Sequence, residues 1–557
     1  MNELGVRALP NSLRKLRHLR YLDLRGNPIE RLPKWIVRLQ NMQTLNLSGC
    51  DMLVELPRDI NKLFNLRHLM VVGCDRLNHM PYGLGELTCL RTLDRFVLSE
   101  DGCISRGGAG LGVLNRLNNL TGNMSIENLW NGKDMVSEAI SANMKEKQSL
   151  TSLSLTWKVN ITGDVNEAEN GEMLLEALQP HSNLKELSVY FFDGVKFAGW
   201  LSSLANIVNL SLEDCQTCQY LPPFDHLPRL KVLRLNGLDA LEYISEASSS
   251  ASRSPFFPSL KKIYLWDCHN LKGWWKQSAL IGSPMTEYEH QHIQQSSLSF
   301  PCLSQLYVGN CPNLTSMPLY PHLEDKLFLG NASLKPLEET MMIGDEDILA
   351  PAETTSSACT CCSLFSIFSP LVSGASDPHV SASSSFPLSK LISLAIEGIE
   401  DIECVPERWL RNLTSLRKLR LSDCRRLRGI PLSPSPSVQH LTALDCLEVR
   451  GCNELDLWKE DESFLQWKSL KSLRTLRIHS CDRLIKLPEG IGNLTSLSEL
   501  GIGDCPNLAS LPEGMCRLTS LETLVIRNCS SLLMQRCEKE RGEDWSKIAH
   551  IPNISIF

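Results

Sequence analysis

The most regular feature of the sequence is a frame of aliphatic residues that recurs along the chain. In each copy, leucines or isoleucines stand at fixed offsets and are followed by a cysteine or asparagine and then by a Leu-Pro step. Near the end, one copy comprises Leu473, Leu476, Ile478, Cys481, Leu484, Leu487 and Pro488, and the next comprises Leu497, Leu500, Ile502, Cys505, Leu508, Leu511 and Pro512. The same frame occurs near the start at Leu19, Leu22, Leu24, Asn27, Ile29, Leu32 and Pro33.

The Leu-x-Leu step has a period of two, which predicts a short strand with both leucines on one face. The Asn or Cys that follows is predicted to lie where the chain leaves the strand, where it can satisfy backbone groups of the turn from inside. A single copy cannot bury its leucines, so the copies must stack. This is the leucine-rich-repeat signature. It predicts an α/β repeat fold, a curved leucine-rich-repeat solenoid with parallel strands on the concave face and loops and short helices on the convex face.

The repeat frame also predicts how the chain is divided, with on the order of 16 units in all. We expect an N-terminal repeat block that starts mid-repeat, an irregular insertion of loop and helix, a central repeat block, a low-complexity and disordered insertion, a C-terminal repeat block and a charged C-terminal cap. These occupy residues 1–98, 99–145, 146–332, 333–388, 389–533 and 534–557, respectively. Residues 245–255 and 276–299 are predicted to be long exposed loops inside the central block.

Composition and charge narrow the class of protein. The 56 basic and 63 acidic residues of the 557-residue chain are spread evenly and give a net charge of −7, so neither nucleic acid nor lipid is indicated as a partner. No stretch has the ~20 consecutive apolar residues of a membrane span, and the start lacks a secretory signal. We therefore expect an intracellular chain, in the cytoplasm or the nucleus, whose 21 cysteines are reduced and mostly structural.

Chemical motifs give no support for catalysis. The glycine-rich stretch SRGGAGLG lacks the lysine of a phosphate-binding loop, so no cofactor site is assigned. Cys215 and Cys218 have the spacing of half a metal or redox site, but no second pair follows and Cys215 already occupies the repeat position. Cys359, Cys361, Cys362, His290 and His292 lie in predicted loops without closing ligands. We therefore expect no metal site and no enzyme activity, because an open solenoid wall offers few enclosed pockets.

The strand frame identifies candidate binding positions without any motif. Residues between and beside the strand leucines point away from the core, and aromatic residues and arginines on such a rigid surface are typical of interface hot spots. The candidates are Lys262, Tyr264, Trp266, Gln305, Tyr307, Lys418, Arg420, Glu448, Arg450, Arg477, His479 and Arg527. An alternative stays open, since any strand face must expose some side chains to water and these positions need not bind anything.

Four segments give the chain a family resemblance. They are LRKLRHLRYLDLRGNPIERLP at the start, LTSLSLTW and ALQPHSNLKELSVYFFDG in the middle, and CEKERGEDWSKIAHIPNI at the end. The chain resembles the repeat region of plant nucleotide-binding leucine-rich-repeat (NBS-LRR) disease-resistance proteins of the coiled-coil class. The resemblance implies a protein partner, either a pathogen effector or a host protein, and a repeat region that restrains a nucleotide-binding domain.

The chain departs from that family pattern because it has no coiled-coil or nucleotide-binding segment. Its first residues, Val6, Leu9 and Pro10, match the second half of a repeat whose strand is missing, so we expect a fragment, a truncated product or a separate sensor. The rival hypothesis is the substrate-receptor subunit of an F-box ubiquitin ligase, which also uses cysteine-containing repeats. The Leu-Pro step fits that class poorly, and no F-box-like helical segment precedes the repeats.

Overall fold

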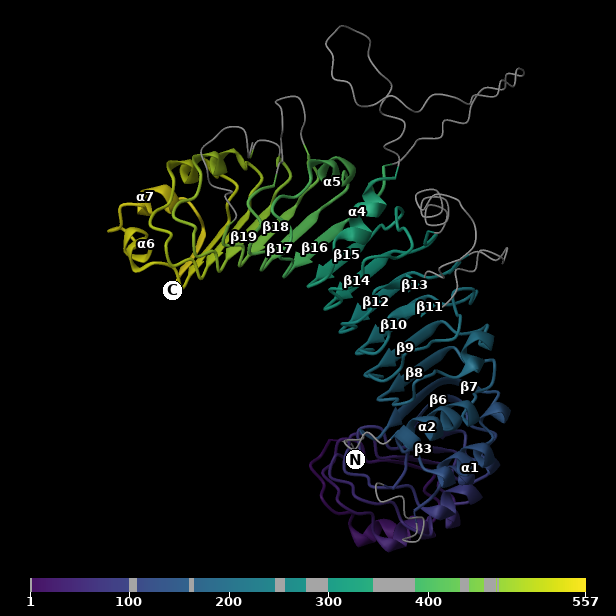
Figure 1. Cartoon of the computed structure of the whole chain (residues 1–557). Coiled ribbons are helices and arrows are strands. Elements are labelled where there is room, and N and C mark those ends of the chain that lie inside the picture. Colours follow the sequence, from purple (N-terminus) through teal and green to yellow (C-terminus); the bar gives the residue numbers. More distant parts are fainter. Residues whose placement is uncertain are drawn as a thin grey trace, which may run out of the picture.

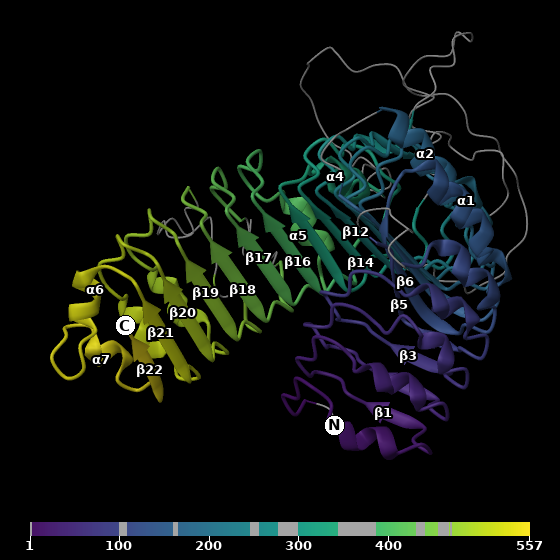
Figure 2. The ribbon, with the colours of Figure 1, turned by 90° about the horizontal axis from the view of Figure 1, so that it is seen from below.

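A computed structural model describes residues 3–99, 108–159, 165–245, 256–276, 299–343, 386–430, 440–454, 467 and 470–557. The chain winds into an arc whose inner side is lined by strands, while helices such as α1, α4 and α5 lie on the outer side (Figure 1). Seen from below, the later strands run side by side without interruption as far as the C-terminus (Figure 2). The predicted fold, a leucine-rich-repeat solenoid, is confirmed.

Among the described residues, the strands that line the arc pair in parallel, each with the next coil, in sheets of 4 and 16 strands. The first sheet comprises β1 (Tyr21–Asp23), β2 (Thr44–Asn46), β3 (His68–Met70) and β4 (Thr92–Leu93). The second comprises β5 (Arg95–Val97), β6 (Gly122–Leu129), β7 (Leu150–Trp157), β8 (Glu186–Tyr190), β9 (Asn209–Glu213), β10 (Val232–Asn236), β12 (Lys262–Trp266), β14 (Gln305–Gly309), β15 (Lys326–Gly330), β16 (Ser393–Glu397), β17 (Lys418–Ser422), β18 (Cys446–Arg450), β19 (Thr475–His479), β20 (Glu499–Gly503), β21 (Thr523–Arg527) and β22 (Asn553–Ile556).

The return segments of the coils are short helices and loops. The α-helices are α1 (Lys133–Ala142), α2 (Val165–Ala177), α4 (Lys335–Met341), α5 (Glu407–Asn412), α6 (Ser531–Arg536) and α7 (Trp545–Ile548). Single-turn 3-10 helices occupy Asn11–Lys15, Lys34–Arg38, Ile60–Lys62, Tyr82–Glu86, Leu111–Arg116, Met144–Glu146, Gly199–Ser203, Glu489–Asn493 and Glu513–Arg517. A separate pair of strands, β11 (Tyr243–Ser245) and β13 (Gly273–Trp275), joins two return segments. These elements agree with the pattern of a strand followed by a loose, partly helical return.

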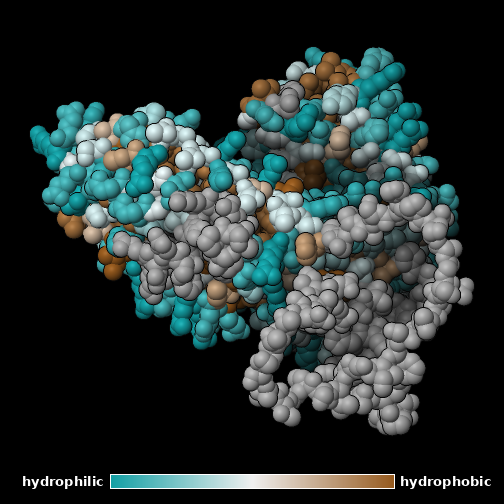
Figure 3. Space-filling model, turned by 90° about the horizontal axis from the view of Figure 1, so that it is seen from above, coloured by the Kyte–Doolittle hydropathy of each residue, from teal (hydrophilic) through white to brown (hydrophobic). Residues whose placement is uncertain are grey.

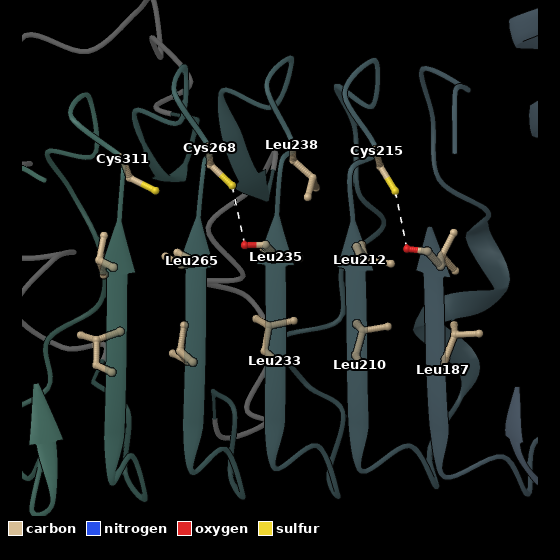
Figure 4. Packing of buried hydrophobic residues seen from close by; sticks show 14 of the residues in the cluster. Leu187, Leu210, Leu212, Cys215, Leu233, Leu235, Leu238, Leu265, Cys268 and Cys311 are labelled. Atoms are coloured by element: carbon tan, nitrogen blue, oxygen red, sulfur yellow. Dashed lines mark hydrogen bonds between the residues drawn. The ribbon is translucent and has the colours of Figure 1, made fainter. Parts of the chain in front are cut away.

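The core is a continuous row of aliphatic side chains between the strands and the return segments. Leu210, Leu212, Leu233 and Leu235 point into it from neighbouring strands and are fully buried (Figure 4). At the N-terminal end of the stack, however, Leu16 is 47% exposed, whereas its equivalents Leu39 and Leu63 are 0% and 1% exposed. In the return segments, the leucine of the first coil is therefore left partly exposed, whereas its equivalents in the next two coils are covered by neighbours.

In many coils a polar residue after the strand connects successive coils, whereas Phe192, Leu238 and Ile399 occupy this position in others. Asn27 is completely buried, accepts hydrogen bonds from the backbone N–H groups of Leu4 (3.1 Å) and Val6 (2.9 Å), and donates to the carbonyl of Leu24 (2.8 Å). In the following coils a thiol takes this place: Cys74 Sγ donates to the carbonyl of Leu47 at 3.1 Å. Burial raises the pKa of Cys74 to about 12, so the thiol keeps the proton that it donates.

The segment predicted to be an irregular insertion differs from expectation. Residues 99–145 hold not only helix α1 but also strand β6, which pairs with β5 and β7, so the solenoid frame continues through this segment. Met124 and Ile126 fill the inward positions that leucines fill elsewhere. Residues 100–107 lie outside the described residues, as do residues 344–385 of the predicted disordered segment; the start of that segment forms α4.

The C-terminal residues 534–557 pack on the last coil around one buried carboxylate. Asp544 is fully buried and accepts hydrogen bonds from the backbone N–H of Leu511 (2.9 Å) and from the guanidinium of Arg536 (2.9 and 3.0 Å). The ammonium of Lys547 lies 2.9 Å from the same carboxylate. Burial opposes the charge of Asp544, but Arg536, the Leu511 N–H and Lys547 outweigh it and lower its pKa.

Replacing Asp544 by alanine should destabilise the end of the solenoid, because Arg536, Lys547 and the Leu511 N–H lose their common partner. We expect the free energy of local unfolding to fall by about 3–5 kcal/mol, measured by hydrogen exchange of the β21 and β22 amides. Because the pKa of Asp544 is lowered on folding, this stabilisation is present above the ordinary value of 3.8 and is lost as the pH falls below it. The matched control is Glu543→Ala, whose side chain is 73% exposed; equal losses in the two variants would contradict the assignment.

Candidate functional site

The structure places all twelve candidate residues on outward positions of strands that line the concave face. Lys262, Tyr264 and Trp266 lie on β12, and Gln305 and Tyr307 lie on β14. The remaining seven lie on β17, β18, β19 and β21: Lys418, Arg420, Glu448, Arg450, Arg477, His479 and Arg527. The residues thus form a middle group and a C-terminal group, separated by β15 and β16. Their role in binding stays a prediction.

The middle group is the centre of an ordered cluster of rings. The Tyr264 and Tyr307 rings are stacked, with centroids 4.7 Å apart and an interplanar angle of 11°. Trp266 stacks on Phe328 of β15 at 5.3 Å, and the Arg234 guanidinium of β10 lies 4.8 Å from the centroid of Tyr264. We call Arg234, Tyr264, Trp266, Tyr307 and Phe328 the aromatic platform. The stacking follows from the register, which sets Arg234, Tyr264, Tyr307 and Phe328 side by side on successive strands.

Two glycines make room for the platform. A Cβ atom on Gly309 would overlap the Cε3 and Cζ3 atoms of Trp266, and one on Gly330 would lie 2.8 Å from Cε1 of Phe328. The ring of Trp266 therefore lies against the backbone of the neighbouring strand β14, and the ring of Phe328 lies against the backbone of its own strand β15. Since β14 carries no side chain at Gly309, the rings of Trp266 and Phe328 can stack on each other across it.

A hollow of about 300 Å³ borders the platform on the side of β9 and β10. Its lining residues are Glu213, Arg234, Leu235, Asn236, Tyr264, Trp266 and Asp267. This volume is at the lower limit of small-molecule sites, which suits one large side chain better than a cofactor.

The C-terminal group is a network of ion pairs between neighbouring strands. Arg420 pairs with Glu448 (2.7 Å), Arg477 with Glu499 (2.9 Å), and Arg527 lies 3.9 Å from Asp504. Such exposed pairs contribute little to stability, typically less than about 1 kcal/mol each. They orient the side chains of this wall while leaving its charges nearly balanced.

A second hollow, of about 400 Å³, opens in this wall over β20. It opens over Gly501, an outward position of β20 that carries no side chain. Its walls include Glu448, Arg450, Arg477, His479 and Arg527. Burial, and then the charge of Arg527, lower the pKa of His479, so this imidazole is neutral near pH 7. Five of the predicted residues are therefore brought together around one depression.

Sequence reasoning did not identify Arg234, Lys326, Phe328 or the two platform glycines. A signal was present, because Lys326–Gly330 reads KLFLG and has the same Leu-x-Leu frame and central aromatic residue as the strand before it. The importance of Gly309 could be recognised only once the neighbour of β12 was known.

The cysteine pair has a structural role. Cys215 is buried and its thiol lies 3.8 Å from the carbonyl of Val189 (Figure 4). The thiol of Cys218 contacts the carbonyl of Tyr220. Burial raises the pKa of both thiols. Cys359, Cys361, Cys362, His290 and His292 lie outside the described residues. Among the residues that are described, no group of three or more His, Cys, Asp or Glu side chains is arranged to hold a metal ion.

Comparison with known proteins agrees with this geometry. Residues 111–238 match a family model described as R13L1/DRL21 LRRs, and residues 18–39 match the Leucine Rich Repeat model. The disease resistance protein RGA2 of Solanum bulbocastanum is 43% identical over 284 residues, which is 50% of this chain and 26% of that protein. The disease resistance RPP13-like protein 1 of Arabidopsis thaliana is 30% identical over 467 residues, 80% of this chain and 40% of that protein. The resemblance to the repeat region of plant NBS-LRR proteins is confirmed.

The matches to these NBS-LRR relatives, RGA2 and the RPP13-like protein, cover well under half of each relative. Among solved structures, a leucine-rich-repeat protein of Leptospira interrogans aligns with 100% of this chain and 94% of its own, at 17% identity and a TM-score of 0.38.

The face seen in Figure 3 is mainly hydrophilic, with hydrophobic residues in small separate groups. In the described part of the chain, no helix has both the length and the apolar character needed to cross a membrane.

Replacing Gly309 by alanine should displace the Trp266 ring without removing any aromatic side chain. We expect the 19F NMR signal of 5-fluorotryptophan at Trp266, assigned with Trp266→Phe, to shift or broaden. The stability should change by less than about 1 kcal/mol, because the ring is partly exposed and can rotate away. Gly501→Ala is the matched control, since its Cβ would meet only Arg477 Cγ at 3.6 Å. An unchanged Trp266 signal in Gly309→Ala would contradict the packing of the platform.

Proposed function

We propose that this chain is a non-enzymatic protein-recognition module that acts in plant defence. Its concave face binds a pathogen effector or a host protein that the receptor guards. The observation that carries the proposal is the aromatic platform, a set of partly exposed aromatic rings and an arginine held in place on a rigid parallel sheet. Tyr, Trp and Arg dominate the binding energy of protein interfaces, and rings that are already ordered lose little entropy when a partner binds.

The resemblance extends the proposal to the longer receptors. In a receptor that also has a nucleotide-binding domain, the repeat region would hold that domain inactive until a ligand is bound. The C-terminal wall, with ion pairs that can exchange partners, offers a polar surface for such a reversible contact. We further propose that the chain acts inside the cell, where its many free cysteines stay reduced.

Replacing Tyr264 and Trp266 together by alanine should weaken the binding of a partner by about 2 kcal/mol or more, which is about a 30-fold rise in Kd. The chain and this variant are expressed in plant cells exposed to a pathogen, co-purifying proteins are identified, and each partner's affinity is then measured by calorimetry with purified proteins. The matched control is Phe64→Ala with Tyr82→Ala, which removes two aromatic rings, 53% and 66% exposed, from the convex return segments.

The same experiment separates the alternatives. Loss of an effector or host protein only in the Tyr264→Ala/Trp266→Ala variant would support recognition through the concave face, and equal affinity in all variants would contradict it. Capture of a nucleotide-binding domain would support the receptor role. Capture of a ubiquitin-ligase scaffold would support the F-box hypothesis instead.

A further inference from the structure

The concave face between β10 and β17 is organised in rows that run across the strands. The register aligns Lys262, Gln305, Lys326, Ser393 and Lys418 in a first row, and Arg234, Tyr264, Tyr307, Phe328, Ala395 and Arg420 in a second. A row containing three lysines therefore runs beside a row of aromatic residues. We call Arg234, Lys262, Tyr264, Tyr307, Lys326 and Phe328 the basic-aromatic strip.

The three cations of this strip are not held in ion pairs among the described residues, although the carboxylate of Asp325 lies beside the strip and accepts a hydrogen bond from Gln305. Arg234 lies over the ring of Tyr264 at 4.8 Å, and Lys326 Nζ lies 5.0 Å from the centroid of Tyr307. Within the part of the chain that the structure describes, Arg234, Lys262 and Lys326 make no ion pair. The strip differs in this respect from the C-terminal wall, where Arg420, Arg477 and Arg527 each have an acidic neighbour.

The rings of the strip cover one another's faces and leave their edges outward. Tyr264 has Arg234 on one side and the stacked Tyr307 on the other, and Lys326 lies over Tyr307. The edge of an aromatic ring carries partial positive charge, whereas its face carries partial negative charge. The cations and the outward ring edges thus present the same sign of charge to a ligand.

We propose that the basic-aromatic strip binds an acidic peptide segment of the partner protein, one that also carries an aromatic or large aliphatic anchor. Carboxylates of the segment contact Lys262, Lys326 and Arg234. The anchor packs against the outward ring edges or enters the hollow of about 300 Å³ beside Trp266. This inference rests on the proposed function, because it names the chemistry of the partner for the same concave face.

The geometry favours a peptide over a nucleic acid, although basic and aromatic residues together suit both. Single-stranded nucleic acids bind by stacking bases on exposed ring faces, and the faces of Tyr264 and Tyr307 are already occupied. The anchor of a peptide needs only ring edges and a small cavity, both of which are present.

A peptide-display selection tests the chemistry without knowledge of the partner. Random peptides of about ten residues extend ~33 Å, enough to cross the strand intervals of ~4.8 Å between β10 and β17. The library is selected on the full chain and depleted on the Lys262→Glu/Lys326→Glu variant. We expect enrichment of Asp and Glu together with Trp, Tyr, Phe or Leu.

A selected peptide is then synthesised with a fluorescent label and its Kd is measured by anisotropy. The Lys262→Glu/Lys326→Glu variant should bind it at least about 30-fold more weakly, and affinity should fall with added salt. Lys262→Arg/Lys326→Arg should retain binding. The matched control is Lys34→Glu/Lys145→Glu, which makes the same change of charge at exposed lysines of the convex 3-10 helices and should leave Kd within about twofold. Circular dichroism of each variant verifies folding.

Three outcomes would overturn the inference. Enriched peptides that are neutral or basic but depend on Tyr264 and Trp266 would show that the surface binds protein with a different chemistry. If a labelled single-stranded RNA binds more tightly than the selected peptide, the ligand of the strip is a nucleic acid and not a peptide. If no peptide is selected but a protein partner still requires Tyr264 and Trp266 for binding, the inference of an acidic segment is contradicted. The proposed function is then still supported.

Discussion

The structure depends on one constraint: the inward leucines of a coil can be buried only by the coils on either side of it. A strand as short as Val232–Asn236 has no stable existence alone, and its Leu233 and Leu235 are fully buried because β9 and β12 flank it. Leu16 lies on the first coil and is half exposed, while its equivalents one and two coils later are buried. The difference shows the same constraint at the end of the stack. Parallel pairing, curvature and length all follow from repeating this contact.

The buried polar residue that follows many of the strands serves the same constraint. The turn that leaves a strand carries backbone groups into the interior, where they need hydrogen-bond partners. The thiol of Cys74 donates to a carbonyl of the preceding coil, and the amide oxygen of Asn27 accepts from the N–H groups of Leu4 and Val6, so coils are joined by hydrogen bonds as well as by leucines. A charged side chain there would have to be desolvated, which explains why protonated thiols are tolerated at this depth.

The frame of leucines allowed the sequence to predict the fold and the direction in which each strand residue points. All twelve candidate residues occupy outward positions for this reason. The prediction did not recognise β6, where Met124 and Ile126 replace leucines, and it also did not include β15. Contacts across the concave face could not be predicted either. Trp266 lies over Gly309, 43 residues away in sequence, and that contact depends on which coil follows β12.

Because the inward positions are committed to the core, the outward ones are free to differ from coil to coil. The concave face uses this freedom in two ways. On the C-terminal wall, each arginine of an ion pair neutralises a carboxylate on the next strand or in a nearby turn, so a partner must displace an existing contact before it gains a new one. On the basic-aromatic strip, the cations rest on rings and keep their charge available. Long-range attraction toward an acidic partner would therefore arise mainly at the strip, while the wall would discriminate at short range among the partners that arrive.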